Sequence, residues 1–406
     1  MNRKTYIIIG LTSAIIIAGI LYFIMRDDSF SNDAGVIAVV TENENEEKNH
    51  YSQSAPDHKA TTQPSANGRD IPSEIVKALA RHQRPDGFID YAFNLYTGEK
   101  EDIDNIIHQT EIGIVYIDYL EKHPDDIQIK KALQNLLNAL TDKIKPGKYG
   151  SQLSFYVNDE MTSDEIKERQ FRGEISATAL MTAAMSRYRK LYSELDFATT
   201  ESHVINTLIA VANFLISSNR LTSKIYQYPP YEIWYAMAVY STAVAKSRSL
   251  ENTMVKLDRF YASMESFIKD KDGLFYFFKT YDLRKNSAST YVKGAVLRNI
   301  KNYGKTYVNS YNPAELNCQN ATLLEEAAAI LKSLDKNIKL QTYFQEQQDI
   351  LKTADLKLLI TPNMTTSGIG AQGNSGKKFA GFFVSGYGNP ITTIKNSISC
   401  YYAFSK

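Results

Sequence analysis

The feature that most constrains the fold is a helical repeat of apolar residues from residue 71 to the C-terminus. Apolar residues recur every three or four positions, and helix-starting residues such as Asp, Thr or Asn-Pro separate the repeats. The pattern predicts an all-α domain of about eleven helices with few strands. The predicted helices span roughly residues 72–83, 105–122, 124–144, 175–192, 199–219, 231–247, 250–270, 287–299, 314–334, 337–360 and 391–405.

These helices fall into two classes. Some carry a face rich in Lys or Glu, which is typical of helices in contact with water, at residues 126–143, 250–269 and 337–357. Others are apolar or small on nearly every face, at residues 175–185, 233–245, 327–331 and 398–404. A helix that is apolar all round is buried on all sides. The alternation therefore predicts inner helices surrounded by outer ones, as in a closed ring of helical hairpins.

The first residues predict a membrane anchor, residues 1–26. Residues 6–25 contain no charged side chain, and a helix of this length spans roughly 30 Å, the thickness of the hydrocarbon layer. Arg3 and Lys4 precede it, which favours an N-terminus in the cytoplasm and a domain outside it, in the periplasm or cell exterior. The alternative is a cleaved signal peptide, but Phe23-Ile24-Met25 makes a poor cleavage site.

A polar segment, residues 27–70, separates the anchor from the domain at residues 71–406. It is rich in Glu, Asn, Ser, Thr, Gln and Pro. Such a composition buries too little apolar surface to offset the entropy lost on ordering, so we expect a flexible tether.

Three stretches of the domain resemble the (α/α)6 toroid superfamily of bacterial glycan-processing proteins. They are the Q-x-P-D-G-F turn at Gln83–Phe88, the R-G-E-x-x-A-T-A-L helix start at Arg172–Leu180, and F-A-G-F-F at Phe379–Phe383 before the closing helix. The resemblance implies a toroid of helical hairpins. It covers glycosidases, polysaccharide lyases and sugar epimerases, and it indicates a fold more strongly than a reaction.

In such a ring, acidic residues at the starts of inner helices can point into one cavity. Glu174 and Glu232 have this placement, and Asp90 and Glu111 are further candidates. Glycoside hydrolysis uses two carboxylates, one protonated and one ionised. We therefore predict Glu174 and Glu232 as an acid–base pair, with Asp90 in reserve. The alternative is that a Glu in the first helical turn only stabilises the helix terminus.

Aromatic and basic residues near these acids are candidate substrate contacts. Tyr228, Tyr231 and the single Trp of the chain, Trp234, surround Glu232, and aromatic rings can stack on sugar faces. Arg172 could bind an acidic sugar, because a guanidinium matches a carboxylate in shape. Glu111 completes the predicted binding set. Core packing for the aromatic residues and surface ion pairs for Arg172 are the alternatives.

Other classes of site receive little support. The chain has 46 basic and 45 acidic residues, so no overall field attracts nucleic acid. The six histidines lack metal-binding spacing, so we predict neither a metal nor a cofactor. Gly368–Gly373 matches G-x-G-x-x-G but lacks the flanking strand and helix, and it is interpreted as a loop. Cys318 and Cys400 cannot be paired or separated from sequence alone.

Two functions follow from these patterns. The first is a membrane-anchored protein outside the cytoplasm that acts on a polysaccharide or oligosaccharide during envelope or capsule biosynthesis, as a hydrolase, lyase or epimerase. The second is a non-catalytic toroid that binds glycan or a partner protein in an export or assembly complex. Two carboxylates that converge in a cavity favour the first, and a filled ring centre favours the second.

Overall fold

The computed structural model describes residues 69–405 except for 95–96, 98, 102–105, 148–149, 154–162, 194–196, 219–229, 245–246, 269, 307–314, 335–337, 361–377 and 387–390. In stretches such as 163–174 it describes the backbone alone. The described part is mostly helical, as predicted, and contains twelve α-helices. None of these helices is both long and apolar enough to cross a membrane. The predicted anchor and most of the tether lie outside the described residues.

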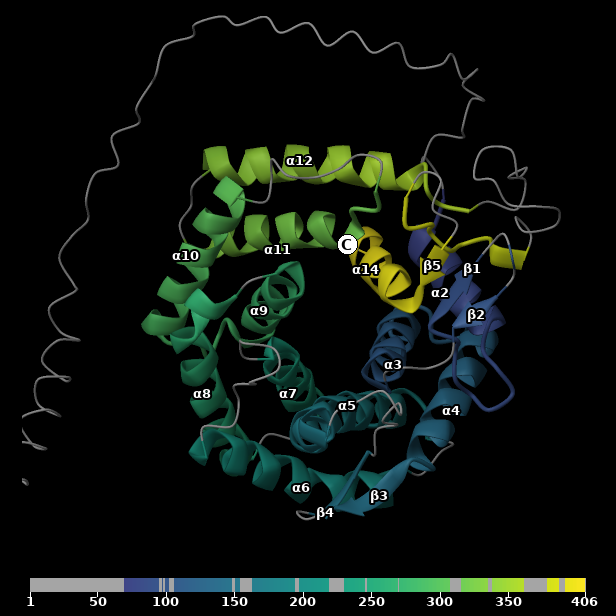
Figure 1. The fold of residues 1–406 in the computed structure, drawn as a ribbon, viewed down its shortest axis with the longest axis vertical. Helices are drawn as coiled ribbons and strands as arrows, with labels where there is room; N and C mark the ends of the chain where they lie inside the picture. Colours follow the sequence, from purple (N-terminus) through teal and green to yellow (C-terminus); the bar gives the residue numbers. More distant parts are fainter. Residues whose placement is uncertain are drawn as a thin grey trace, which may run out of the picture. The chain divides into compact units, whose positions relative to one another are not determined.

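Six helices pack against one another in a closed ring: α3 (Ile106–Leu120), α5 (Ser163–Leu191), α7 (Tyr231–Ala243), α9 (Lys271–Arg284), α11 (Cys318–Leu334) and α14 (Ile394–Phe404). Each contacts the next, and α14 returns to contact α3 (Figure 1). In this order α3 lies opposite α9, and α7 lies opposite α14.

Six further helices cover the outside of this ring: α2 (Ile71–Arg81), α4 (Ile127–Thr141), α6 (Ala198–Ser217), α8 (Arg248–Ser263), α10 (Thr290–Thr306) and α12 (Ile338–Leu356). Each packs on at least one ring helix. The predicted division into inner and outer helices is confirmed, because the helices predicted to be apolar all round are in the ring and the three with charged faces are outside it. The physical reason is burial: ring helices have neighbours on several sides, whereas outer helices keep one face in water.

The chain sets the helix starts through local capping. The Asp126 side chain accepts a hydrogen bond from the backbone N–H of Ile129 at the start of α4, and Ser247 does the same for α8. Asp270 caps α9 by accepting from the N–H of Gly273. These bonds satisfy amide groups that the first helical turn leaves without partners.

Two predicted elements differ from the structure. No helix was predicted between residues 270 and 287, but Lys271–Arg284 forms α9, which the sequence pattern missed. Helix α5 begins at Ser163, well before the predicted start near residue 175. In both cases polar residues in the first turns obscured the apolar period, although Asp and Glu are favourable there.

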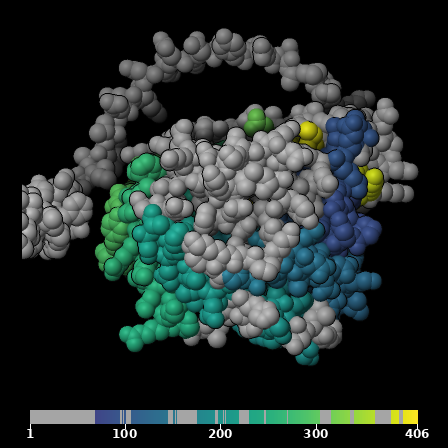
Figure 2. Space-filling model, turned by 60° about the horizontal axis from the view of Figure 1, so that its bottom comes forward, coloured from purple at the N-terminus to yellow at the C-terminus, as the bar shows by residue number. Residues whose placement is uncertain are grey.

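Short strands join the two ends of the domain. β1 (Ala92–Asn94) lies between β2 (Lys100–Glu101) and β5 (Ile391–Thr393), antiparallel to both. A separate hairpin pairs β3 (Ile144–Gly147) with β4 (Gly150–Leu153). Figure 2 shows residues from the C-terminal end of the chain beside those of the N-terminal part of the domain. The pairing of β1 with β5 thus helps to close the ring.

A disulfide joins Cys318 at the start of α11 to Cys400 in α14. Both residues are buried in the core, and 82 residues of sequence separate them. The bond therefore ties two neighbouring ring helices together. Closing a loop of this length restricts the unfolded chain and favours the folded state.

Candidate functional site at the ring mouth

The N-terminal ends of the ring helices meet at one end of the ring. The second residue of α9, Asp272, contacts the second residues of α11 and α14: it accepts hydrogen bonds from Gln319 at 2.5 Å and from Lys395 at 2.5 Å. Helix N-termini carry partial positive charge, so this end of the ring is suited to hold carboxylates. We call the polar residues gathered here the ring mouth: His108, Glu111, Glu232, Asp272, Tyr276, Gln319 and Lys395.

A hydrogen bond crosses the ring at the mouth. The hydroxyl of Tyr276 on α9 donates to Oε1 of Glu111 on α3, the opposite helix, at 2.9 Å. The other carboxylate oxygen of Glu111 lies 3.1 Å from Nδ1 of His108. The Glu111 carboxylate, only 7% exposed as a residue, is therefore held between a phenol and an imidazole.

Tyr276 is a neutral acid in this setting. Burial raises the pKa of its phenol well above the ordinary value, and the nearby charges of Glu111, Glu232 and Asp272 raise that pKa further. The phenol therefore keeps its proton at neutral pH and can donate a hydrogen bond. The charge of Glu232 on α7 thus acts on the same phenol as that of Glu111, whereas the side chain of Glu174, its predicted partner, lies outside the described residues.

Asp272 has the opposite behaviour. Burial alone would raise its pKa, but the charge of Lys395 and the hydrogen bonds from Lys395 and Gln319 outweigh it, and the pKa lies below its ordinary value. Asp272 is therefore ionised at neutral pH. One mouth acid stays charged beside a phenol that stays protonated, which is the separation that acid–base chemistry needs.

Below the mouth, side chains fill the centre of the ring. The hydroxyls of Tyr235 on α7 and Tyr402 on the opposite helix α14 lie 3.4 Å apart. The Lys279 ammonium lies 3.5 Å from the centre of the Tyr402 ring and 3.7 Å from Oε1 of Glu326. We call Tyr235, Lys279, Glu326 and Tyr402 the ring floor. A ligand at the mouth would rest on this floor.

The segment before β1 holds the mouth in place. The backbone N–H and C=O of Ile89 exchange hydrogen bonds with the side-chain amide of Gln109 at 3.1 and 2.7 Å. Tyr91 stacks on His108 with ring centres 5.6 Å apart, and its carbonyl accepts from the N–H of Ile394. The starts of α3 and α14 are therefore fixed to the same short segment.

Asp90 lies in this segment but does not join the mouth. Its carboxylate is buried and forms ion pairs with Arg84 at 3.1 Å and Lys100 at 2.8 Å. Two cations compensate its charge, which fits a structural role better than the catalytic role held in reserve for it. For the remaining candidates, the side chains of Arg172, Glu174 and Tyr228 lie outside the described residues.

The prediction that Trp234 and Tyr231 contact substrate is corrected by their burial. Trp234 is 0% exposed and donates from Nε1 to Asp258 at 2.8 Å. Tyr231 is 1% exposed and donates to the carbonyl of Met264. Both side chains leave α7 toward α8, because a helix turns about 100° per residue and Tyr235, one residue after Trp234, takes the ring-facing position.

Sequence reasoning missed most of the mouth: His108, Asp272, Tyr276, Gln319 and Lys395. A usable signal existed in their positions, because Glu232, Asp272, Gln319 and Lys395 are each the second residue of a ring helix. Tyr276 and Lys279 then follow Asp272 at helical spacing. Without α9 in the predicted element list, this register could not be assigned. Among the described residues, no group of three or more His, Cys, Asp or Glu side chains could hold a metal.

Comparisons with known proteins are sparse. No protein-family model matches the chain, and no curated protein is similar to it in sequence. The fold is similar to a solved structure of a polysaccharide lyase, with a TM-score of 0.46 and 10% sequence identity over 82% of this chain and 51% of that protein. The chain thus spans about half the length of the lyase that it matches.

Proposed function

We propose that the chain is a membrane-anchored protein outside the cytoplasm, and that its domain is an (α/α)6 toroid that acts on a polysaccharide in envelope or capsule biosynthesis. The observation that supports this most is the contact of Tyr276 with Glu111 across the ring mouth, beside Glu232 and His108. Groups from α3 and α9 meet there, and the charge of Glu232 on α7 acts on the same phenol.

The chemistry of the mouth suits cleavage of a glycosidic bond. The protonated phenol of Tyr276 is placed to give a proton to a leaving oxygen, and a carboxylate can accept one or stabilise positive charge. Glu232 acts as the base in this proposal, together with Glu174 from the neighbouring helix α5. Glu111 and His108 position the phenol, and the proton that Glu232 takes up returns to the phenolate after the product leaves.

The disulfide between Cys318 and Cys400 supports the location outside the cytoplasm, because disulfides persist in oxidising compartments and are rare in the cytosol. A reporter fused after Lys406 tests this location. We expect it to be active only on the outer side of the membrane, and a fusion active in the cytoplasm would reverse the orientation.

The second candidate is a toroid that binds glycan or a partner protein without catalysis. The ring floor favours it, since Tyr235, Tyr402, Lys279 and Glu326 leave the centre below the mouth filled. A filled centre limits the depth of any cavity. The binding function would use the same mouth but would need no proton transfer.

Activity measurements on the purified full chain separate these candidates. Polysaccharides of the envelope and capsule type are incubated with the wild type and with Tyr276→Phe and Glu232→Gln, and new reducing ends and unsaturated products are followed. Both variants should lose at least about 100-fold in rate, the usual contribution of a positioned acid or base, with folding intact.

Matched controls are Tyr291→Phe and Glu346→Gln, which make the same changes at exposed sites on outer helices. Both should keep wild-type rates. Full activity of Tyr276→Phe and Glu232→Gln would rule out the catalytic assignment. Substrate binding without turnover in the wild type would favour the second candidate.

A further inference from the structure

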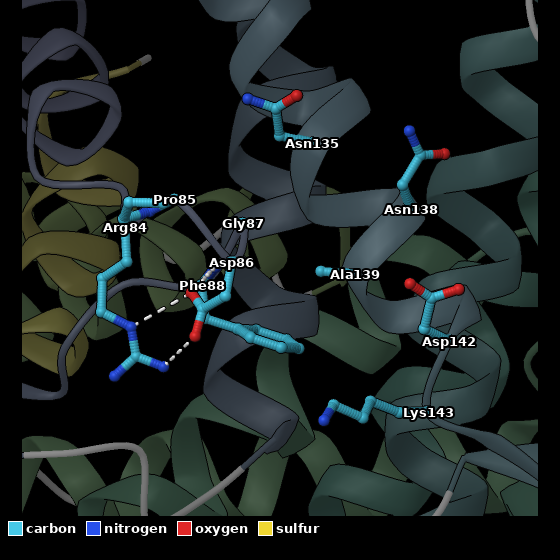
Figure 3. A pocket seen from close by; sticks show the side chains of 10 residues that line it. All are labelled: Arg84, Pro85, Asp86, Gly87, Phe88, Asn135, Asn138, Ala139, Asp142 and Lys143. Atoms are coloured by element: carbon cyan, nitrogen blue, oxygen red, sulfur yellow. Dashed lines mark hydrogen bonds and ion pairs between the residues drawn. The ribbon is translucent and has the colours of Figure 1, made fainter.

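A hollow lies away from the ring mouth, on the outside of the domain. Its volume is about 720 Å³, and it lies between the turn Arg84–Phe88 and the C-terminal part of α4 (Figure 3). We call it the outer groove. The residues from α4 and the loop after it are Asn135, Asn138, Ala139, Asp142 and Lys143. Its volume lies within the range of small-molecule binding sites.

The turn is fastened to α4, so the walls of the groove are fixed. Gly87 has φ +89°, and a Cβ there would lie 2.6 Å from the backbone oxygen of Asn135, so the turn touches the helix where only glycine fits. The amide Nε2 of Gln83 donates to the carbonyls of both Gly87 and Ala132, at 2.8 and 2.9 Å. The Q-x-P-D-G-F string thus encodes one wall of the groove.

The opposite wall presents hydrogen-bonding groups that the protein does not use. Asn135, Asn138 and Asp142 are exposed and lie on one face of α4 and its C-cap, at spacings of three and four residues. Among the described residues, no side chain or backbone group forms a hydrogen bond with these three side chains. Figure 3 shows them along one side of the hollow. Each amide offers two donors and an acceptor.

The charges of the groove are balanced. The Arg84 guanidinium donates to the Asp86 carboxylate through Nε at 3.1 Å and Nη2 at 2.5 Å. Lys143 lies 5.9 Å from the centre of the Phe88 ring, next along the chain to Asp142. With two cations and two anions in its lining, the groove offers no net charge to attract an anionic ligand. It offers amides and a carboxylate that can bind neighbouring hydroxyl groups.

We propose that the outer groove is a second saccharide-binding site, which takes a neutral oligosaccharide separately from the ring mouth. The saccharide class of the ligand rests on the proposed function, whereas the place and the neutral character rest on the groove itself. Such a site would hold a glycan chain beside the domain while the mouth acts on another part of it.

The test measures binding of the full chain to cellohexaose, maltohexaose and hexa-N-acetylchitohexaose, with hexagalacturonate and the chitosan hexamer as charged probes. At least one neutral probe should bind. The double variant Asn135→Ala/Asn138→Ala should weaken it about tenfold or more, because hydrogen bonds from two amides are lost. The exposed Gln128→Ala on the same helix is the matched control and should bind as the wild type does.

Tyr276→Phe separates this inference from the proposed function. It should keep the binding that the double variant loses, even if its own activity is lost or if the wild type proves inactive. Three results would overturn the inference: no binding of any neutral probe, tighter binding of a charged probe, or binding that Tyr276→Phe removes and the double variant leaves intact.

Discussion

Two regions each combine an aromatic hydrogen-bond donor with a carboxylate: the ring mouth, and a cluster formed by Trp234, Asp258, Tyr261 and Arg284, called the Trp234 cluster. The charge of the carboxylate that accepts from the aromatic donor is balanced by a cation only in the Trp234 cluster. In the cluster, Asp258 accepts from Trp234 and also pairs with Arg284 at 2.9 Å. At the mouth, Glu111 accepts from Tyr276, and within the described part of the chain its one further partner is His108. A carboxylate with a permanent cation beside it is part of the packing, whereas one between two proton-exchanging groups can take part in chemistry.

The cluster should be the costlier of the two to disturb. Trp234→Ala removes an unexposed indole that stacks on Tyr261 at 5.5 Å, and it leaves Asp258 without one donor. We expect a loss of about 3–5 kcal/mol in the free energy of unfolding, measured by denaturant titration. Phe267→Ala, at a side chain 41% exposed, should cost less than about 1 kcal/mol. If Trp234→Ala also costs less than about 1 kcal/mol, the cluster is not packed as described.

Asp355 shows how burial changes the pKa of a carboxylate that has no ion pair within the described residues. Asp355 at the end of α12 is 0% exposed and accepts from the N–H of Asn317 at 2.7 Å. Burial raises its pKa to about 7, and the hydrogen bond from Asn317 lowers it only partly. The folded state therefore holds a proton that the unfolded state releases near pH 3.8.

The sign of the resulting pH dependence follows from this difference. Between about pH 4 and pH 7 the folded state binds more protons, so the contribution of Asp355 makes stability fall as the pH rises, by a few kcal/mol in all. Asp355→Asn should remove this fall, measured as the free energy of unfolding at several pH values. Asp349→Asn, on an exposed part of the same helix, should keep it. An unchanged pH profile in Asp355→Asn would contradict the raised pKa.

Removal of single hydroxyls should distinguish the mouth from the cluster on a smaller scale. Tyr276→Phe removes one hydrogen bond to Glu111, which keeps His108 as a partner, so the cost should be about 1 kcal/mol or less. Tyr261→Phe leaves the carbonyl of Pro230 without its buried donor, so about 1–3 kcal/mol is expected. Denaturation curves of the two variants give the comparison, and the reverse order would mean that the mouth is the more tightly packed region.

The smallest effect is expected for the ion pair of Asp272 with Lys395. The two side chains are 45% and 40% exposed, so Lys395→Met should cost less than about 1 kcal/mol and should lose even that at high salt. Arg284→Met in the cluster is the matched change at a buried pair, with an expected cost of about 3–5 kcal/mol. If Lys395→Met and Arg284→Met lower the free energy of unfolding equally, the ion pair at the mouth is as strongly coupled to folding as the buried pair in the cluster.

Part of the site was predictable because it depends on local rules. Glu111 and Glu232 were named from their positions near the starts of apolar helices, and both carboxylates act on the Tyr276 phenol, although their predicted roles stay predictions. Tyr276 was missed because no helix was predicted between residues 270 and 287, and the register that brings Asp272, Tyr276 and Lys279 to one face was missed with it. Trp234 was assigned to the substrate because its neighbours in sequence are aromatic, although its neighbours in space are Asp258 and Tyr261.

The sequence by itself determined most of the helical segments and which of them are buried, because helix period, capping and apolar content act over a few residues; α9 was the exception. It did not determine that Cys318 meets Cys400, that Glu111 reaches Tyr276, or that Trp234 turns away from the ring centre. These contacts join residues far apart in the chain, and they depend on the order and rotation of the helices around the ring. A rotation of one residue, about 100°, exchanges Trp234 for Tyr235, so only the packed ring decides which side chain faces its centre.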